Sequence, residues 1–220
     1  GFDIIAYFRM PNLTPNVEGF VALWANRQRG QGATTVVIKS AVQTKFYTEF
    51  LTRLAKEPFA VLTNNSTDVG AFKKTSRKDV MSAPMVQDIQ QLYKLHMYRE
   101  QKFGLTPAKP RFLAAMGQEV DYYAHATAVE IRRQVETGYF IHAGNDVYIP
   151  TIVGAFMMTW KQLPPIKNML ASARNRRAQQ ALAEAEATPL RVESRGCTFV
   201  DRCDDWPAPG RREAVSSAVG

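Results

Sequence analysis

The sequence predicts a mixed α/β protein in which a small sheet carries flanking helices. Three short apolar runs, at 3–10, 33–40 and 59–63, have the β-branched and aliphatic composition of buried strands. The segments between them place large apolar residues three and four positions apart, the spacing of an amphipathic helix. The first 63 residues are therefore expected to follow a β-α-β-α-β order, and such alternation is typical of helices laid on a sheet.

The first of these helices is expected at about 14–30. Thr14 is a suitable N-cap, and Pro15 would occupy the first helical position, where its missing N–H costs nothing. Gly30 or Gly32 would end the helix. Its apolar face would consist of Val17, Phe20, Val21 and Trp24.

The second helix is expected at about 41–57. Its apolar residues recur in steps of four, and Pro58 would stop it before the third strand. These residues are Val42, Phe46, Phe50 and Leu54.

Four further helices and a hairpin are expected after residue 75. The first two helices, at about 85–101 and 118–137, each carry an apolar stripe, and Gly138 would end the second. A turn at Gly144-Asn145-Asp146 predicts a short hairpin. A helix at 151–161 would then stop at Leu163-Pro164-Pro165, and the last helix would run from about 166 to 187.

The composition describes a globular and strongly basic chain. Its 220 residues are 45% apolar and 22% charged, with a net charge of +8 and a pI near 9.6. Such a balance favours a polyanionic partner: nucleic acid first, and an anionic membrane surface as the less favoured alternative. No apolar run reaches the ~18 residues that a membrane-spanning helix needs.

No arrangement of residues points to catalysis, a metal or a cofactor. The three histidines lack metal-ligand spacing, and Cys197 and Cys203 have no second pair with which to hold zinc. The chain is therefore expected not to be an enzyme and to have no cofactor. The alternative is a small α/β enzyme with a site after the third strand, built from Asn64, Asp68 and His142.

Basic residues at the ends of strands and helices predict an RNA-binding surface. Cations in such positions, with Ser, Thr and Asn neighbours, are typical phosphate-contacting groups. The candidate RNA-binding residues are Arg9, Arg27, Arg29, Lys39, Lys45, Lys73, Lys74, Arg77 and Lys78.

Two sets of motifs resemble the ribosomal large-subunit stalk-base protein, the bacterial and organellar family that anchors the stalk dimers. "IIAYFRMPNLTPNVEGF" is similar to that family's first strand and helix start, with Leu13-Thr14 at the start. "VVIKSAV" is similar to the family's second strand. Lys39 keeps the family's lysine, whereas Ser40 replaces its asparagine and Val42 replaces its leucine. "HAGNDVYIPTIVGAFMMTWKQLPPIKNMLASA" follows the family's order of a turn, a helix, Leu-Pro and a further helix.

The resemblance implies a structural constituent of the large ribosomal subunit that binds rRNA at the stalk base and contacts neighbouring ribosomal proteins. It implies an rRNA-binding α/β domain at 1–75 and 138–163, a helical insertion at 76–137, a C-terminal helical arm at 164–188 and an irregular extension at 189–220. The missing glycine before Leu13 and the long tail resemble a divergent mitochondrial member, which implies a location in the mitochondrial matrix. Met169, Leu170 and Ala173 would contact the stalk dimers. A ribosome-assembly factor of the same fold is the alternative.

Overall fold

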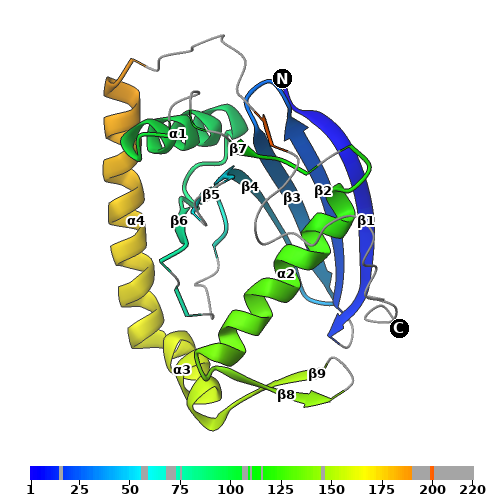
Figure 1. Ribbon diagram of the computed structural model, residues 1–220. Coiled ribbons are helices and arrows are strands. Elements are labelled where there is room, and N and C mark those ends of the chain that lie inside the picture. Colours follow the sequence, from blue (N-terminus) through cyan, green and yellow to red (C-terminus); the bar gives the residue numbers. More distant parts are fainter. Residues whose placement is uncertain are drawn as a thin grey trace.

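A computed structural model gives the fold of the chain (Figure 1). It describes residues 1–14, 17–55, 59–67, 73–74, 76–105, 109, 111–114, 116–144, 147–189 and 199–200. Asp68, both cysteines and most of the extension after 189 lie outside the described residues, so the predictions made for them have no structural counterpart.

The larger sheet contains eight strands, six of which are neighbours in chain order. Strands β1 to β5 form an antiparallel meander, whereas β6 pairs in parallel with β5. The short strand β7 pairs with β4 and with β10. The strands are β1 Asp3–Thr14, β2 Val17–Asn26, β3 Gln31–Ser40, β4 Thr44–Leu54, β5 Ala60–Asn64, β6 Lys78–Ser82, β7 Arg111–Phe112 and β10 Phe199–Val200.

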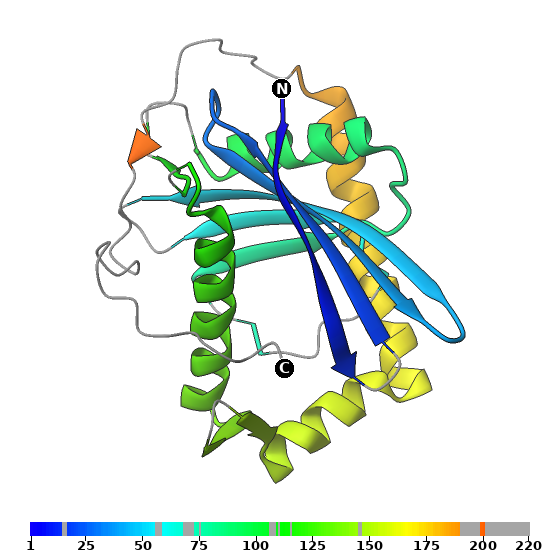
Figure 2. The ribbon, with the colours of Figure 1, turned by 90° about the vertical axis from the view of Figure 1, so that its right-hand side faces the viewer.

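In the described part of the chain, four helices and a separate hairpin lie around this sheet. The helices are α1 Ile89–Lys102, α2 Glu119–Glu136, α3 Ile152–Gln162 and α4 Pro164–Ala187, and the hairpin joins β8 Phe140–Gly144 to β9 Val147–Pro150. Figure 1 shows the hairpin and α3 at the foot of the molecule, with α4 rising along one side. Figure 2 shows α2 crossing in front of the sheet and α4 behind it.

The two faces of the sheet carry different helices. On one face, which we call the α1 face, Phe50 of β4 packs against α1, and the buried alanines of α4 complete this core. On the opposite face, Tyr123 of α2 packs with Phe8, Val21 and Val36. The sheet is therefore a middle layer with a helix on each side.

The mixed α/β class and the flanking helices are confirmed, but the β-α-β-α-β order is wrong. The segments expected to form helices at 14–30 and 41–57 lie mainly in strands β2 and β4. Both strands have apolar residues on both faces, because helices cover the sheet from both sides. The two-residue alternation that marks a half-exposed strand is therefore missing. Leu13-Thr14, which the resemblance places at a helix start, ends β1.

The helices predicted after residue 75 are confirmed, as is the break between α3 and α4 at Leu163. Their packing differs from that of an insertion followed by an arm. α1 and α2 lie on opposite faces of the sheet, and α1 covers the core of one face. α4 is not an arm leaving the body, since Ala178, Ala181 and Ala185 are buried against the core.

Candidate nucleic-acid interface

The α1 face of the sheet has an open half, on the side of the β3–β4 turn. The strand register places Arg9, Phe20, Val37 and Phe46 next to one another in one row across β1 to β4. The hydrogen-bonded strands are about 4.8 Å apart, so this row spans roughly 14 Å. In Figure 2 the β3–β4 hairpin extends past the helices at the lower right.

The side chains of this open half are exposed because α1 covers only the other end of the same face. Phe50, four residues further along β4 on the same face, is 3% exposed beneath α1, whereas Phe46 is 54% exposed. Phe20 is 41% exposed and Tyr7, in the neighbouring row, is 82% exposed. We call Tyr7, Arg9, Phe20, Lys39 and Phe46 the open sheet surface.

Two cations lie among these aromatic rings. The guanidinium carbon of Arg9 lies 6.0 Å from the centroid of the Phe20 ring, and the same group forms an ion pair with Glu18. Lys39 is exposed near the end of β3, opposite Glu18 and Thr44. Exposed aromatic rings with nearby cations on a sheet are the elements that bind single-stranded nucleic acid, since bases stack on rings and phosphates pair with cations.

The structure places the other predicted cations elsewhere. Arg27 and Arg29 lie at the β2–β3 turn, the opposite end of the strands from Lys39. Arg27 forms an ion pair with Glu119. The carbonyl of Arg29 accepts a hydrogen bond of 2.8 Å from Arg111.

The remaining basic candidates form no common surface with the open sheet surface. Lys45 is opposite Ile38 in the register and therefore points to the face that carries α2. Lys78 forms an ion pair of 2.6 Å with Glu130 of α2. Lys73, Lys74 and Arg77 are exposed before β6, close to α2, where the Lys73 backbone pairs with Gln134.

The candidate residues for stalk-dimer contact lie in the first half of α4. Met169 is 60% exposed, Ala173 is also exposed, and Leu170 is partly buried.

The described residues of the alternative enzyme site lie in different elements. Asn64 lies in β5 and donates a 2.9 Å hydrogen bond to Glu49, whereas His142 lies in the separate β8–β9 hairpin beside Tyr148. The described residues hold no group of three His, Cys, Asp or Glu side chains that could bind a metal ion.

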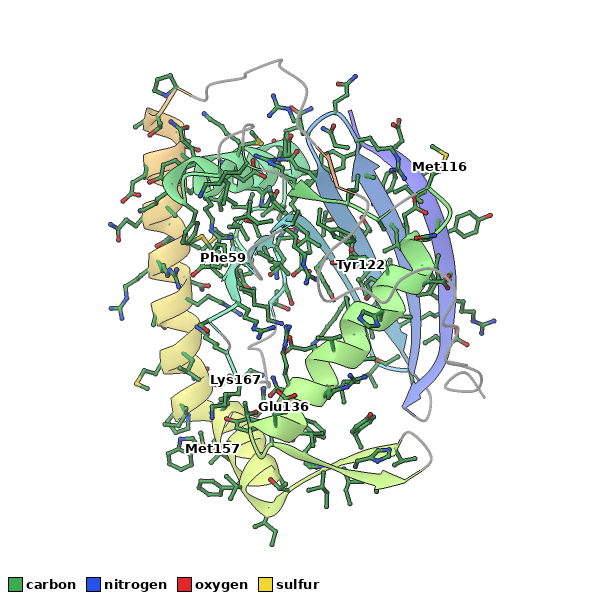
Figure 3. The ribbon with its side chains drawn as sticks, viewed as in Figure 1. Phe59, Met116, Tyr122, Glu136, Met157 and Lys167 are labelled. Atoms are coloured by element: carbon green, nitrogen blue, oxygen red, sulfur yellow. The ribbon has the colours of Figure 1, made fainter. Side chains whose placement is uncertain are left out.

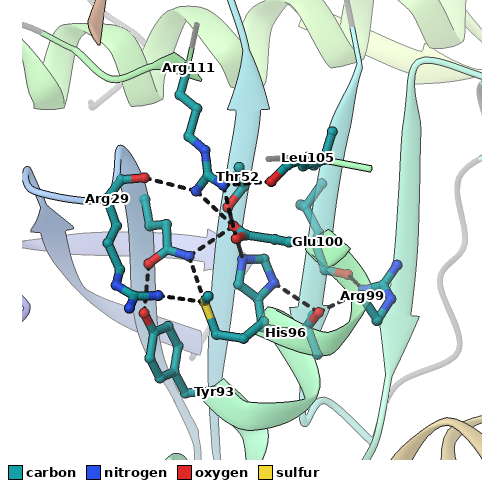
Figure 4. Close-up of polar contacts among 12 residues, drawn as sticks. Arg29, Thr52, Tyr93, His96, Arg99, Glu100, Leu105 and Arg111 are labelled. Carbon is teal, nitrogen blue, oxygen red and sulfur yellow. Dashed lines mark hydrogen bonds and ion pairs between the residues drawn. The ribbon is translucent and has the colours of Figure 1, made fainter. Parts of the chain in front are cut away.

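A buried polar network between α1 and the sheet was not predicted from the sequence (Figure 4). Arg99 donates to Thr63 at 2.7 Å, and the Thr63 hydroxyl lies 3.0 Å from Nδ1 of His96. Nε2 of His96 lies 3.0 Å from the Thr52 hydroxyl, which donates to Glu100. The chain of hydrogen bonds thus runs from a cation to an anion through a histidine that is 0% exposed.

The ionisation states in this network follow from burial and from the partners. Burial lowers the pKa of His96, because the charged imidazolium would lose its hydration; Glu100 opposes this effect. Burial alone would raise the pKa of Glu100, but His96, Arg111 and Gln31 lower it to about 2. The network therefore holds a neutral histidine beside a carboxylate paired with Arg111.

This network is structural rather than a binding site. Arg99, His96 and Glu100 are each at most 2% exposed, and each has protein partners. Arg111 joins Glu100 to the carbonyls of Arg29 and Leu105, so α1 is tied to the β2–β3 turn and to β7. In the sequence, the only sign of this network is that His96 and Arg99 lie three positions apart in a predicted helix. That spacing fits an exposed helix face equally well.

No known protein family, curated protein or solved structure matches this chain.

Proposed function

We propose that this chain is a non-enzymatic RNA-binding protein and that the open sheet surface is its RNA site. The observation that supports this best is the row of Arg9, Phe20 and Phe46 on the half of the α1 face that no described helix covers. Rings of this kind stack on bases of any sequence, contributing about 1–3 kcal/mol per base. The net charge of +8 favours the same polyanionic partner over long range.

The RNA that we propose is large-subunit rRNA at the stalk base of the mitochondrial ribosome. Support for this finer statement is the resemblance in the order of motifs around Lys39 and Leu163-Pro164, together with the basic composition. Neighbouring ribosomal proteins, including stalk dimers at Met169, would be its protein partners. An aromatic sheet surface fits a single-stranded or looped rRNA segment better than a regular duplex, because bases must be unstacked before they can stack on Phe20 and Phe46.

The test is an RNA-binding titration with the double variant Phe20→Ala and Phe46→Ala. Loss of two stacking rings should weaken binding of a labelled single-stranded RNA by about tenfold or more. The matched control is Val42→Ala, which removes an apolar side chain that is 90% exposed on the adjacent turn. Fluorescence anisotropy at constant salt measures the affinity, and circular dichroism checks that each variant is folded.

An affinity for RNA that is the same in the double variant and in the wild type would remove the open sheet surface from the interface. The ribosomal part is tested separately, by co-sedimentation of the chain with large subunits and by sequencing of the RNA that is recovered. RNA binding through this surface to transcripts other than large-subunit rRNA would keep the RNA site and overturn the ribosomal assignment.

A further inference from the structure

The foot of the molecule carries large apolar side chains that the fold leaves uncovered. It consists of the β8–β9 hairpin, α3 and the first turns of α4 (Figure 1). Ile152 is 91% exposed and Phe156, one turn further along α3, is 61% exposed. The exposed large apolar residues of this end, which we call the apolar foot, are Ile141, Val147, Ile149, Ile152, Val153, Phe156, Trp160 and Leu163. Contiguous apolar surfaces of this kind mark sites of interaction with proteins or membranes.

The apolar foot is held rigidly in this exposed arrangement. The Thr151 side chain caps α3 by accepting a 2.9 Å hydrogen bond from the Gly154 N–H, and it donates at 2.6 Å to the Gly138 carbonyl. α3 lies so close to the hairpin base that a Cβ on Gly154 would come within 2.0 Å of the Tyr139 carbonyl oxygen. The exposed side chains therefore belong to a fixed surface.

Charge distinguishes the possible occupants of this surface. Residues 147–183, which follow Asp146, contain no Asp or Glu and include the cations Lys161, Lys167, Arg174, Arg176 and Arg177, the last of which pairs with Asp79. Figure 3 places Lys167 and Met157 close to the junction of α3 and α4, with Glu136 of α2 beside them. An apolar surface at whose border cations outnumber acidic residues is complementary to a bilayer interface with anionic headgroups.

The shape of the apolar foot agrees with this occupant. The hairpin and α3 project from one end of the molecule, so the surface is an end that can enter a headgroup layer. The Trp160 ring stacks on the Phe156 ring, with 5.9 Å between the ring centroids. The next residue, Lys161, lies over the Tyr139 ring. Tryptophan and lysine side by side are typical of the membrane–water boundary, where the ring and the aliphatic stem are buried and the charge stays in water.

A helix of this length lies on a membrane rather than crossing it. α3 has 11 residues, which corresponds to about 16 Å, while the hydrocarbon core is about 30 Å thick. No helix in the described part of the chain is long and apolar enough to span a bilayer. We propose that the apolar foot docks this protein peripherally onto an anionic lipid bilayer, with Ile152, Phe156 and Trp160 inserted and Lys167 at the headgroups.

The test is co-sedimentation of the full chain with lipid vesicles. Wild type should bind vesicles of phosphatidylcholine and phosphatidylserine mixed two to one, and bind vesicles of phosphatidylcholine alone much more weakly. The double variant Ile152→Glu and Phe156→Glu should lower the affinity for the mixed vesicles by about tenfold or more. Val42→Glu is the control, because Val42 is equally exposed at 90% but lies outside the apolar foot.

The contribution of positive charge is tested with Lys167→Gln. Its control is Lys74→Gln, which removes an exposed lysine from another surface. Only the first should reduce vesicle binding. Absence of binding to the mixed vesicles, or an equal loss in Val42→Glu, would overturn the proposal. The proposal would also be overturned if the wild type failed to bind vesicles and instead formed a dimer or a protein complex that the Ile152→Glu, Phe156→Glu variant no longer forms. RNA affinity should be unchanged in this variant, so the RNA proposal and the membrane proposal can fail independently.

Discussion

At the scale of single residues, the buried network decides the state of one histidine. Thr52 donates to Glu100, so its oxygen must accept from Nε2–H of His96. Thr63 accepts from Arg99 and still has its own hydrogen to donate to Nδ1. A neutral imidazole with its proton on Nε2 fits these donors, and the lowered pKa of the ring agrees with it.

The first prediction is that the free energy of unfolding falls as the pH drops below 6.5. His96 has its usual pKa of 6.5 in the unfolded chain and a lower one in the fold, so the unfolded chain binds the proton first. The loss should approach about 1.4 kcal/mol per pH unit. Glu100, lowered from 4.5 to about 2, adds a second loss of stability between those two pH values.

Urea unfolding between pH 7 and pH 5 measures this dependence. His96→Gln should be less stable at pH 7 and should have a flatter pH dependence between pH 6.5 and pH 5. The control is His142→Gln, which removes an exposed histidine from the hairpin. A wild-type free energy that stays constant over this range would show that His96 is not held neutral by the fold.

At the scale of elements, α4 shows how a helix of small residues can belong to a core. Ala178, Ala181 and Ala185 recur at spacings of three and four, which places them on one face of the helix. All three are buried next to Leu92 and Leu95 of α1. Alanine allows close approach of the two helices, so a stripe without large side chains still packs.

The second prediction follows from this close packing. Ala178→Leu should lower the free energy of unfolding by about 1–3 kcal/mol, because Ala178 is 0% exposed and additional atoms would overfill the core around it. Ala173→Leu, at an exposed position of the same helix, should have little effect. Thermal or urea unfolding of the two variants measures the difference. Equal stability of both variants would mean that α4 leaves the body in solution.

At the scale of the whole molecule, two candidate surfaces lie on different parts of the fold. The open sheet surface lies on β1 to β4, whereas the apolar foot lies on the hairpin, α3 and early α4. The first combines aromatic rings with Arg9 and Lys39, and the second combines aliphatic and aromatic residues with Lys161 and Lys167. The net charge of +8 attracts both proposed partners, RNA and an anionic bilayer, because both are negatively charged.

The third prediction concerns salt. If Arg9 and Lys39 each neutralise one phosphate, replacing both by Gln should reduce the slope of log affinity against log salt by about 1.4 for single-stranded RNA. Lys45→Gln, on the opposite face of the sheet, should leave the slope unchanged. Titrations at three or more salt concentrations measure the slopes. A slope reduced by Lys45→Gln and not by the double variant would place the RNA on the face that carries α2.

The sequence by itself determined the mixed class, the three apolar strands and the four later helices, because caps, prolines and apolar spacing act locally. It could not distinguish β4 from a helix, since residues 46, 50 and 54 recur in steps of four, which is also a multiple of the two-residue period of a strand. Tertiary structure decided that assignment by covering both faces of the sheet. It also decided that Phe50 is buried and Phe46 exposed, because only the position of α1 separates them. The network around His96 likewise exists only where α1 brings that ring between Thr52 and Thr63, groups that are 44 and 33 positions away along the chain.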